Sequence, residues 1–137
     1  MNIGQAAKAS GVSAKMLRHY ESIGLLPRAV RTESGYRIYE KAEVETLRLI
    51  RSARDFAMPL ARVGRLVALW RNKGRPSAEV KRIAEEHIAE LGEKIAALQA
   101  MKRTLAQLVR ACPGDASPDC PILDDLGRRQ APPAGGS

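Results

Sequence analysis

The sequence predicts a mostly α-helical protein with a winged helix-turn-helix head, a long dimerisation helix and a C-terminal loop that holds both cysteines. Three observations carry this prediction. Residues 1–39 show two short helical patterns followed by a turn-rich, strand-like segment. Residues 77–111 lack proline and place apolar residues three and four apart. The chain's two cysteines, Cys112 and Cys120, follow directly after that long pattern.

Length and charge limit the possible functions. A chain of 137 residues fits one small domain, or a head with an extension. The formal net charge of +8 favours a polyanionic partner, with nucleic acid ahead of a membrane. No apolar run approaches the ~20 residues that span a bilayer, and the first residues lack a signal-peptide pattern. We therefore expect no membrane partner and a cytoplasmic location, where thiols stay reduced.

Residues 1–23 predict the helix-turn-helix. Gly11 allows a tight turn between two short helices. Ser13 is a good N-cap for a second helix from Ala14 to about Ile23. Gly24 is well placed to end that helix.

Residues 25–39 predict a small two-stranded wing, because a Glu33-Ser34-Gly35 turn is followed by an alternating segment. Such a wing is too short to stand alone and must lean on the helices. Two helices then follow, at about 41–56 and 60–71, with Pro59 in the first turn of the second. We assign residues 1–71 to the head with its connecting helices.

Residues 77–111 predict the long helix, with Ser77 as its cap and Glu79 near its positive end. At 1.5 Å per residue such a helix is about 50 Å long, too long for the small head to cover. We expect an antiparallel coiled coil with a second copy of the chain; the alternative is a monomer whose helix folds back on residues 41–71. Residues 112–126 form the cysteine loop and a short helix, and residues 127–137 are expected to be a disordered tail.

Basic and aromatic residues gather in the head. Basic side chains neutralise phosphates, and arginine also reads guanine edges. A solvated basic surface with a tyrosine in the core is the alternative for each residue taken singly. As a set on a winged helix-turn-helix they predict contacts to double-stranded DNA. The set comprises Lys15, Arg18, His19 and Tyr20 on the second helix, and Arg31, Tyr36 and Arg37 on the wing.

The cysteine pair suits a metal that accepts two soft donors. Soft thiolates favour monovalent copper over hard cations, and two thiolates fall short of the four ligands that Zn(II) prefers. A disulfide or two inert thiols are the alternatives, the first disfavoured in cytosol. Neither a C-x-x-C spacing nor a nucleophile–base set is present, so we expect no enzyme. A copper chaperone module would carry no DNA-reading head. His87 is interpreted as an ordinary helix-surface or interface residue.

Two strings in the head resemble the MerR family. They are Arg18-His19-Tyr20-Glu21-Ser22-Ile23-Gly24-Leu25 and Arg31-Thr32-Glu33-Ser34-Gly35-Tyr36-Arg37-Ile38-Tyr39. The resemblance implies a homodimer that binds a pseudo-palindromic promoter, with the second helix in the major groove and the wing on the backbone. It makes Lys15 and Arg18 base or phosphate contacts. It makes Tyr20, Arg31, Tyr36 and Arg37 phosphate contacts.

The segments Ala111-Cys112-Pro113-Gly114-Asp115 and Asp119-Cys120-Pro121-Ile122 look like the metal loop of the family's copper-efflux regulators. The resemblance implies one Cu(I), or Ag(I) or Au(I), per chain. It also implies that the protein activates metal-efflux genes by distorting promoter DNA for RNA polymerase. Ser77 stands where divalent-ion sensors of the family carry a cysteine, and Lys81 would add positive charge near the site. A sensor of another thiophilic ion is the alternative.

Three features depart from the family pattern: the segment Ala57-Met58-Pro59, the pair Ala61-Arg62 where acidic residues are common, and a tail without the cysteines and histidines of some relatives. Ala57-Met58-Pro59 replaces a Gly-Phe-Ser/Asn-like segment, so we expect that helix junction to pack differently.

Overall fold

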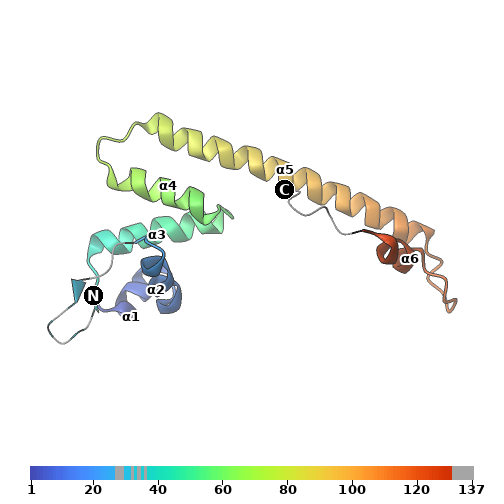
Figure 1. The fold of residues 1–137 in the computed structure, drawn as a ribbon, viewed down its shortest axis with the longest axis horizontal. Helices are drawn as coiled ribbons and strands as arrows, with labels where there is room; N and C mark the ends of the chain where they lie inside the picture. Colours follow the sequence, from blue (N-terminus) through green and yellow to red (C-terminus); the bar gives the residue numbers. More distant parts are fainter. Residues whose placement is uncertain (27–29, 32, 34, 36, 131–137) are drawn as a thin grey trace. The chain divides into compact units, whose positions relative to one another are not determined.

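The computed structural model describes residues 1–26, 30–31, 33, 35 and 37–130. In chain order the elements are α1 (Ile3–Ser10), α2 (Ala14–Ser22), β1 (Val30–Arg31), β2 (Arg37–Ile38), α3 (Lys41–Asp55), α4 (Leu60–Arg71), α5 (Ser77–Ala111) and α6 (Pro121–Arg128) (Figure 1). The prediction of a mostly α-helical fold with a winged head and a long helix is confirmed.

The chain divides into two compact units, Met1–His87 and Ile88–Ser137. The division falls inside α5, so about the first three turns of that helix belong to the head unit. The head unit thus extends past residues 1–71, the range expected from the sequence.

Side-chain hydrogen bonds cap the starts of both helices of the helix-turn-helix. The side chain of Asn2 accepts from the backbone N–H of Gln5 at 2.8 Å, while the Gln5 side chain accepts from the Asn2 N–H at 2.9 Å. Gly11 then turns the chain with φ 77°, and a Cβ there would lie 3.0 Å from the Arg51 side chain. Ser13 caps α2 by accepting from the N–H of Met16 at 3.2 Å. The predicted roles of Gly11 and Ser13 are confirmed.

Helices α2 and α3 end in the same hydrogen-bond pattern. After α2, the N–H of Gly24 donates to the Glu21 carbonyl and the N–H of Leu25 to that of Tyr20. After α3, the N–H of Ala57 donates to the Arg54 carbonyl and that of Met58 to the carbonyl of Ala53. Both are Schellman motifs, which need a left-handed residue: Gly24 has φ 79° and Ala57 has φ 60°. Ala57 therefore carries a strain that Gly24 does not.

The wing is a minimal antiparallel ladder. Val30 pairs with Ile38, and Arg31 pairs with Arg37. The chain then returns to the head through Tyr39, whose backbone N–H donates to the Met1 carbonyl at 2.6 Å and whose buried hydroxyl donates to the Glu21 carboxylate. Two-residue strands cannot hold themselves together, so this anchor to α2 fixes where the wing leaves the head.

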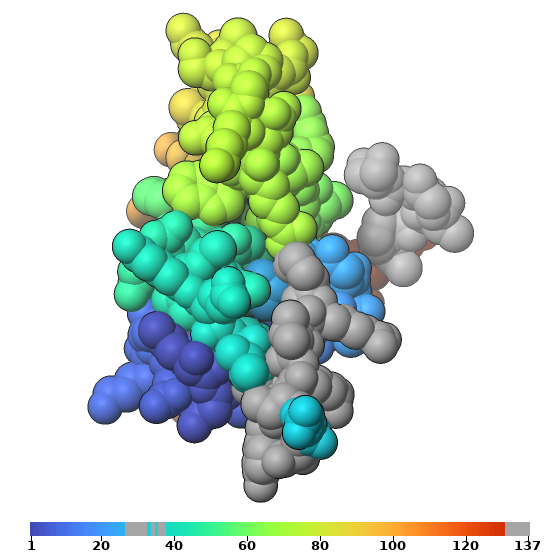
Figure 2. Space-filling view, turned by 90° about the vertical axis from the view of Figure 1, so that its left-hand side faces the viewer, coloured from blue at the N-terminus to red at the C-terminus, as the bar shows by residue number. Residues whose placement is uncertain are grey.

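The head's core is built from one face of each helix. On the face shown in Figure 2, α1 lies at the bottom, α3 above it, and the end of α4 with the start of α5 at the top. Helix α3 contributes four apolar residues at helical spacing, and α4 closes the core with two valines. The buried apolar residues of α3 and α4 are Val44, Leu47, Ile50, Ala53, Val63 and Val67.

Two details of the long helix and the tail differ from prediction. Helix α5 begins at Ser77, which is therefore its first helical residue and not the cap that precedes it. Helix α6 continues through Gly127 and Arg128, which the sequence analysis assigned to the tail. The rest of the expected tail, from residue 131 on, lies outside the described residues. Within the described part of the chain, no helix combines the length and the apolar character needed to cross a bilayer.

Candidate DNA-binding surface and metal-binding loop

Helix α2 presents a basic face to solvent. Its inner face buries Leu17, Tyr20 and Glu21 in the head. Lys15, Arg18 and His19 are exposed, and their i, i+3 and i+4 spacing places them on one side of the helix. A helix that is anchored on one face and basic on the other can lie in a DNA groove and donate to phosphates and base edges.

Tyr20 differs from these neighbours. Its side chain is only 6% exposed and belongs to the core cluster, with its ring centroid 6.1 Å from that of His19. The structure thus gives Tyr20 a packing role, in line with the alternative of a core tyrosine. A DNA contact from Tyr20 stays a prediction.

For the three wing residues of the predicted DNA set, the structure gives only the backbone pairing of two. Arg31 and Arg37 pair with each other across the ladder, so both occur at one level of the wing. Tyr36 lies outside the described residues. Their contacts to phosphate stay predictions.

Both cysteines lie at helix ends. Cys112 follows the last residue of α5, and its N–H donates to the carbonyls of Leu108 and Val109 at 3.1 and 3.2 Å. Cys120 occupies the N-cap position of α6, with Pro121 as the first helical residue. Both are free thiols and half-buried.

The loop between the cysteines is ordered by its own side chains. Gly114 takes φ 64°. The Asp115 carboxylate accepts from the N–H of Ser117 at 2.8 Å, and the Ser117 hydroxyl accepts from the N–H of Asp119 at 3.3 Å. These are local side-chain turns of the kind that aspartate and serine favour. Among the residues described, no group of three or more His, Cys, Asp or Glu residues that could hold a metal occurs, and a two-thiolate site at Cys112 and Cys120 stays a prediction.

Ser77 and Lys81 lie one turn apart at the start of α5, and both are exposed. They belong to the head unit, whereas Cys112 and Cys120 belong to the second unit. Their predicted place beside the metal stays a prediction, because it requires a second copy of the chain.

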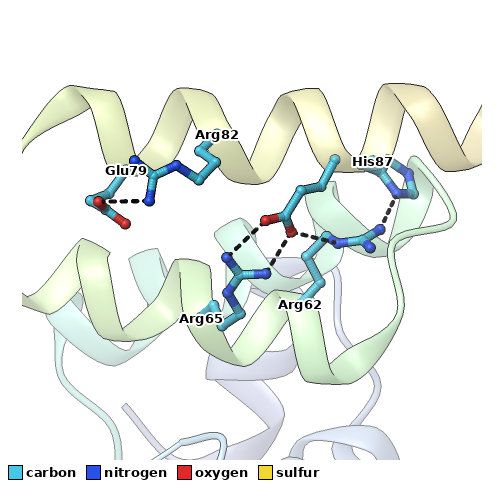
Figure 3. A network of polar contacts seen from close by, with 6 residues as sticks. Arg62, Arg65, Glu79, Arg82 and His87 are labelled. Atoms are coloured by element: carbon cyan, nitrogen blue, oxygen red, sulfur yellow. Dashed lines mark hydrogen bonds and ion pairs between the residues drawn. The ribbon is translucent and has the colours of Figure 1, made fainter.

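A polar cluster that the sequence analysis missed joins α5 to α4 (Figure 3). His87 is 4% exposed, so of the two expected places, helix surface or interface, the structure gives it an interface between helices. Its Nδ1 lies 3.0 Å from Arg62 Nη1, and its Nε2 lies 2.7 Å from the Phe56 carbonyl oxygen. Its position four residues after the buried Ile83 was a sequence signal for burial, because residues at i and i+4 share a helix face.

Beside His87, an exposed ion pair crosses between the same two helices. Arg65 donates twice to the Glu86 carboxylate, at 2.6 and 3.2 Å. The hydrogen bond from Arg65 is the largest cause that holds the pKa of Glu86 below its usual range; desolvation opposes it, and the charges of Arg65, Arg62 and Arg82 add to it. The same hydrogen bond raises the pKa of Arg65.

Comparison with known proteins agrees with this architecture. The family described as "MerR family regulatory protein" matches residues 2–39, and the one described as "MerR, DNA binding" matches residues 44–108. The chain is 53% identical over 131 residues to heavy metal-dependent transcription regulator 2 of Rhizobium meliloti (strain 1021), covering 96% of this chain and 89% of that protein. It is 43% identical over 126 residues to the HTH-type transcriptional regulator CueR of Escherichia coli O6:H1, covering 92% and 93% of the two chains.

Among solved structures, the chain resembles the transcription regulator PbrR691 of Ralstonia metallidurans CH34 in complex with lead(II). The TM-score is 0.80 at 33% identity, and the match covers 92% of this chain and 98% of that one. These relatives are transcription regulators and not enzymes, as the sequence analysis predicted. Matches of this length and identity mean that the chain belongs to the MerR family of DNA-binding transcription regulators.

Proposed function

We propose that this protein is a transcription activator that responds to Cu(I), or to the related ions Ag(I) and Au(I), and controls metal-efflux genes. One ion binds per chain through Cys112 and Cys120. The observation that carries the proposal is the isolated pair of free thiols on an ordered loop between two helix ends. Soft thiolates are the ligands that monovalent copper prefers.

Electrostatics supports a monovalent ion. Two thiolates and one +1 ion carry a net charge of −1, which needs nearby positive partial charge when it is withdrawn from water. The N-terminus of α6 supplies such charge at Cys120. We propose that Lys81 of a second chain supplies more.

The proposed active form is a homodimer. Helix α5 carries an apolar stripe that is exposed in the single chain. An apolar groove of 410 Å³ between α5 and α6 is also open, lined by Met101, Leu105, Leu108 and Leu126 among others. An antiparallel pairing of two α5 helices would cover the stripe and bring each cysteine loop towards the partner's Ser77. The stripe comprises Ile88, Ile95, Leu98, Met101, Leu105 and Val109.

The proposed mode of action is deformation of the promoter and not release from it. The family resemblance motivates this: both forms occupy the operator, and the metal-bound form bends and untwists the DNA so that RNA polymerase can engage. Such deformation costs roughly 1–6 kcal/mol. A dimer with two arrangements of its heads can supply this as differential binding.

A sensor of another thiophilic ion is the second candidate. The observation in its favour is the likeness to a lead(II)-bound regulator. A three-thiolate site is disfavoured, because the chain has serine at position 77 and no cysteine besides Cys112 and Cys120. A copper chaperone module is disfavoured by the DNA-binding head.

The test is a titration with Cu(I), Ag(I), Zn(II) and Pb(II) under anaerobic reducing conditions, with transcription from the operator as readout. We expect Cu(I) and Ag(I) to induce, Cys112→Ser and Cys120→Ser each to abolish induction, and operator binding by both variants to be retained. Footprinting should show altered DNA geometry with modest change in affinity. Full induction in both variants would sink the proposal, and dissociation by metal would make the protein a derepressor.

A further inference from the structure

Each nitrogen of the His87 ring has a hydrogen-bond partner. A guanidinium only donates, so His87 Nδ1 accepts from Arg62 Nη1 at 3.0 Å. A carbonyl only accepts, so Nε2–H donates to the Phe56 carbonyl at 2.7 Å. The ring is therefore held from both sides, as acceptor on one and as donor on the other. This is a directional contact between α5, α4 and the α3–α4 turn.

The turn that receives this hydrogen bond is strained. Ala57, the residue after Phe56, takes φ 60° without being glycine or asparagine. Arg54 Nη1 also donates to the Met58 carbonyl at 2.7 Å, from the helix before the turn. Strained backbone persists where surrounding contacts over-determine it. His87 and Arg54 are such contacts, on either side of Ala57.

The cluster lies where α5 leaves the head. His87 is the last residue of the head unit, and the exposed apolar stripe begins at the next residue, Ile88. Apolar contacts between helices tolerate small slides, but a pair of hydrogen bonds to one ring does not. A shift or rotation of α5 at His87 is therefore passed to Arg62 and to the α3–α4 turn.

We propose that His87 is a positioning residue that couples movement of the dimerisation helix to the DNA-binding head, through Arg62 and the Phe56 carbonyl. The inference rests on the proposed function in one respect: metal binding is the signal that moves α5. The coupling between α5 and the head does not depend on which signal moves the helix. Reciprocity requires that DNA binding at the head also alters α5 beyond His87.

The test compares His87→Leu with His87→Gln in the full-length dimer. Leucine fills the space but offers neither acceptor nor donor, whereas the glutamine carboxamide offers both on one planar group. With Cu(I) as the probe, His87→Leu should lower the induction ratio by about fivefold or more, the lower end of usual coupling. Metal stoichiometry and operator affinity of the metal-free form should match wild type. His87→Gln should restore induction.

Arg65→Gln is the matched control, because it removes the exposed contact to Glu86 between the same helices. It should leave induction unchanged. Equal loss in Arg65→Gln would overturn the proposal, as would full induction in His87→Leu. Loss of operator binding or metal binding in both His87 variants would also overturn the proposal, because His87 would then be needed only for the fold.

A second readout needs no metal. Amide hydrogen exchange in residues 88–111 should change when wild type and His87→Gln bind operator DNA, and should not change in His87→Leu. An identical response in all three would overturn the coupling. A wild-type protein that shows this response but no induction by Cu(I) would contradict only the proposed function.

Discussion

At the scale of single residues, Gly24 and Ala57 can be compared directly, because they occupy equivalent positions at the ends of two helices. Both close a Schellman motif in the left-handed region, one with glycine and one with alanine. Ala57→Gly should therefore stabilise the protein by about 1 kcal/mol, and Gly24→Ala should destabilise it by about the same amount. Urea unfolding of the two variants measures this.

The comparison isolates backbone strain, because a Cβ at Gly24 meets nothing within 4 Å. Gly11→Ala serves as the contrast: its Cβ would also press on Arg51, 3.0 Å away, so its loss of stability should exceed that of Gly24→Ala. If Ala57→Gly instead lowered the free energy of unfolding, the alanine side chain would contribute more to stability than the backbone strain at this position costs.

Glu86 makes stability depend on pH in acid. The Arg65 hydrogen bond keeps the pKa of Glu86 lower in the folded chain than in the unfolded one. Its contribution is therefore complete above the unfolded carboxyl's pKa and is lost as the pH falls through the folded value. The difference in unfolding free energy between wild type and Glu86→Gln should shrink on acidification, and also in high salt because the pair is exposed. A difference that is constant with pH would contradict this.

At the scale of elements, local rules were sufficient for most helices. Caps and glycines marked the ends of α2, and the spacing of apolar residues marked α3, α4 and α5. These local rules failed at residues whose conformation or burial depends on a contact far along the chain or on an unusual residue type. Ala57 turns the chain without glycine, so local propensity did not predict its conformation; the one sign was the glycine that the family pattern has in its place. His87 finds its partners 25 and 31 residues back along the chain, which no helical period encodes.

The candidate site shows the same limit. Helical spacing predicts that Lys15, Arg18 and His19 share one side of α2, and the cysteine count predicts the thiol pair. Tyr20 shares their helix but faces the core, because its position relative to Leu17 places it on the buried side.

The start of α5 should decide which ions the protein accepts. Ser77→Cys would offer a thiolate from a second chain to the Cys112–Cys120 pair, and thus a third soft ligand. We expect Zn(II) or Hg(II) to bind more tightly to this variant. Because Ser77 is a helical residue and not the cap, the cost in stability should stay below the roughly 1 kcal/mol of a lost cap. Unchanged binding of divalent ions in a titration would place Ser77 away from the metal.

At the scale of the whole molecule, the stripe on α5 predicts obligate pairing. Ile95 lies within it and is 55% exposed in the single chain. Ile95→Glu would place a charge in the proposed coiled coil, and sedimentation should then show monomers that bind the operator weakly. Ala96→Glu adds the same charge at a position of α5 that has no stripe residue three or four places away, so this variant should remain dimeric. Dimers in both variants would mean that another surface joins the chains.

The same stripe has a genetic consequence. A chain with alanine in place of Lys15 and Arg18 keeps α5 intact, so under the proposed dimerisation we expect it to pair with wild-type chains synthesised in the same cell. Every such mixed dimer would carry one head that cannot bind its half of a palindrome. Such an allele should be dominant negative, silencing the operator in a merodiploid strain. The same allele with Ile95→Glu added should be recessive, because its product can no longer capture a wild-type partner.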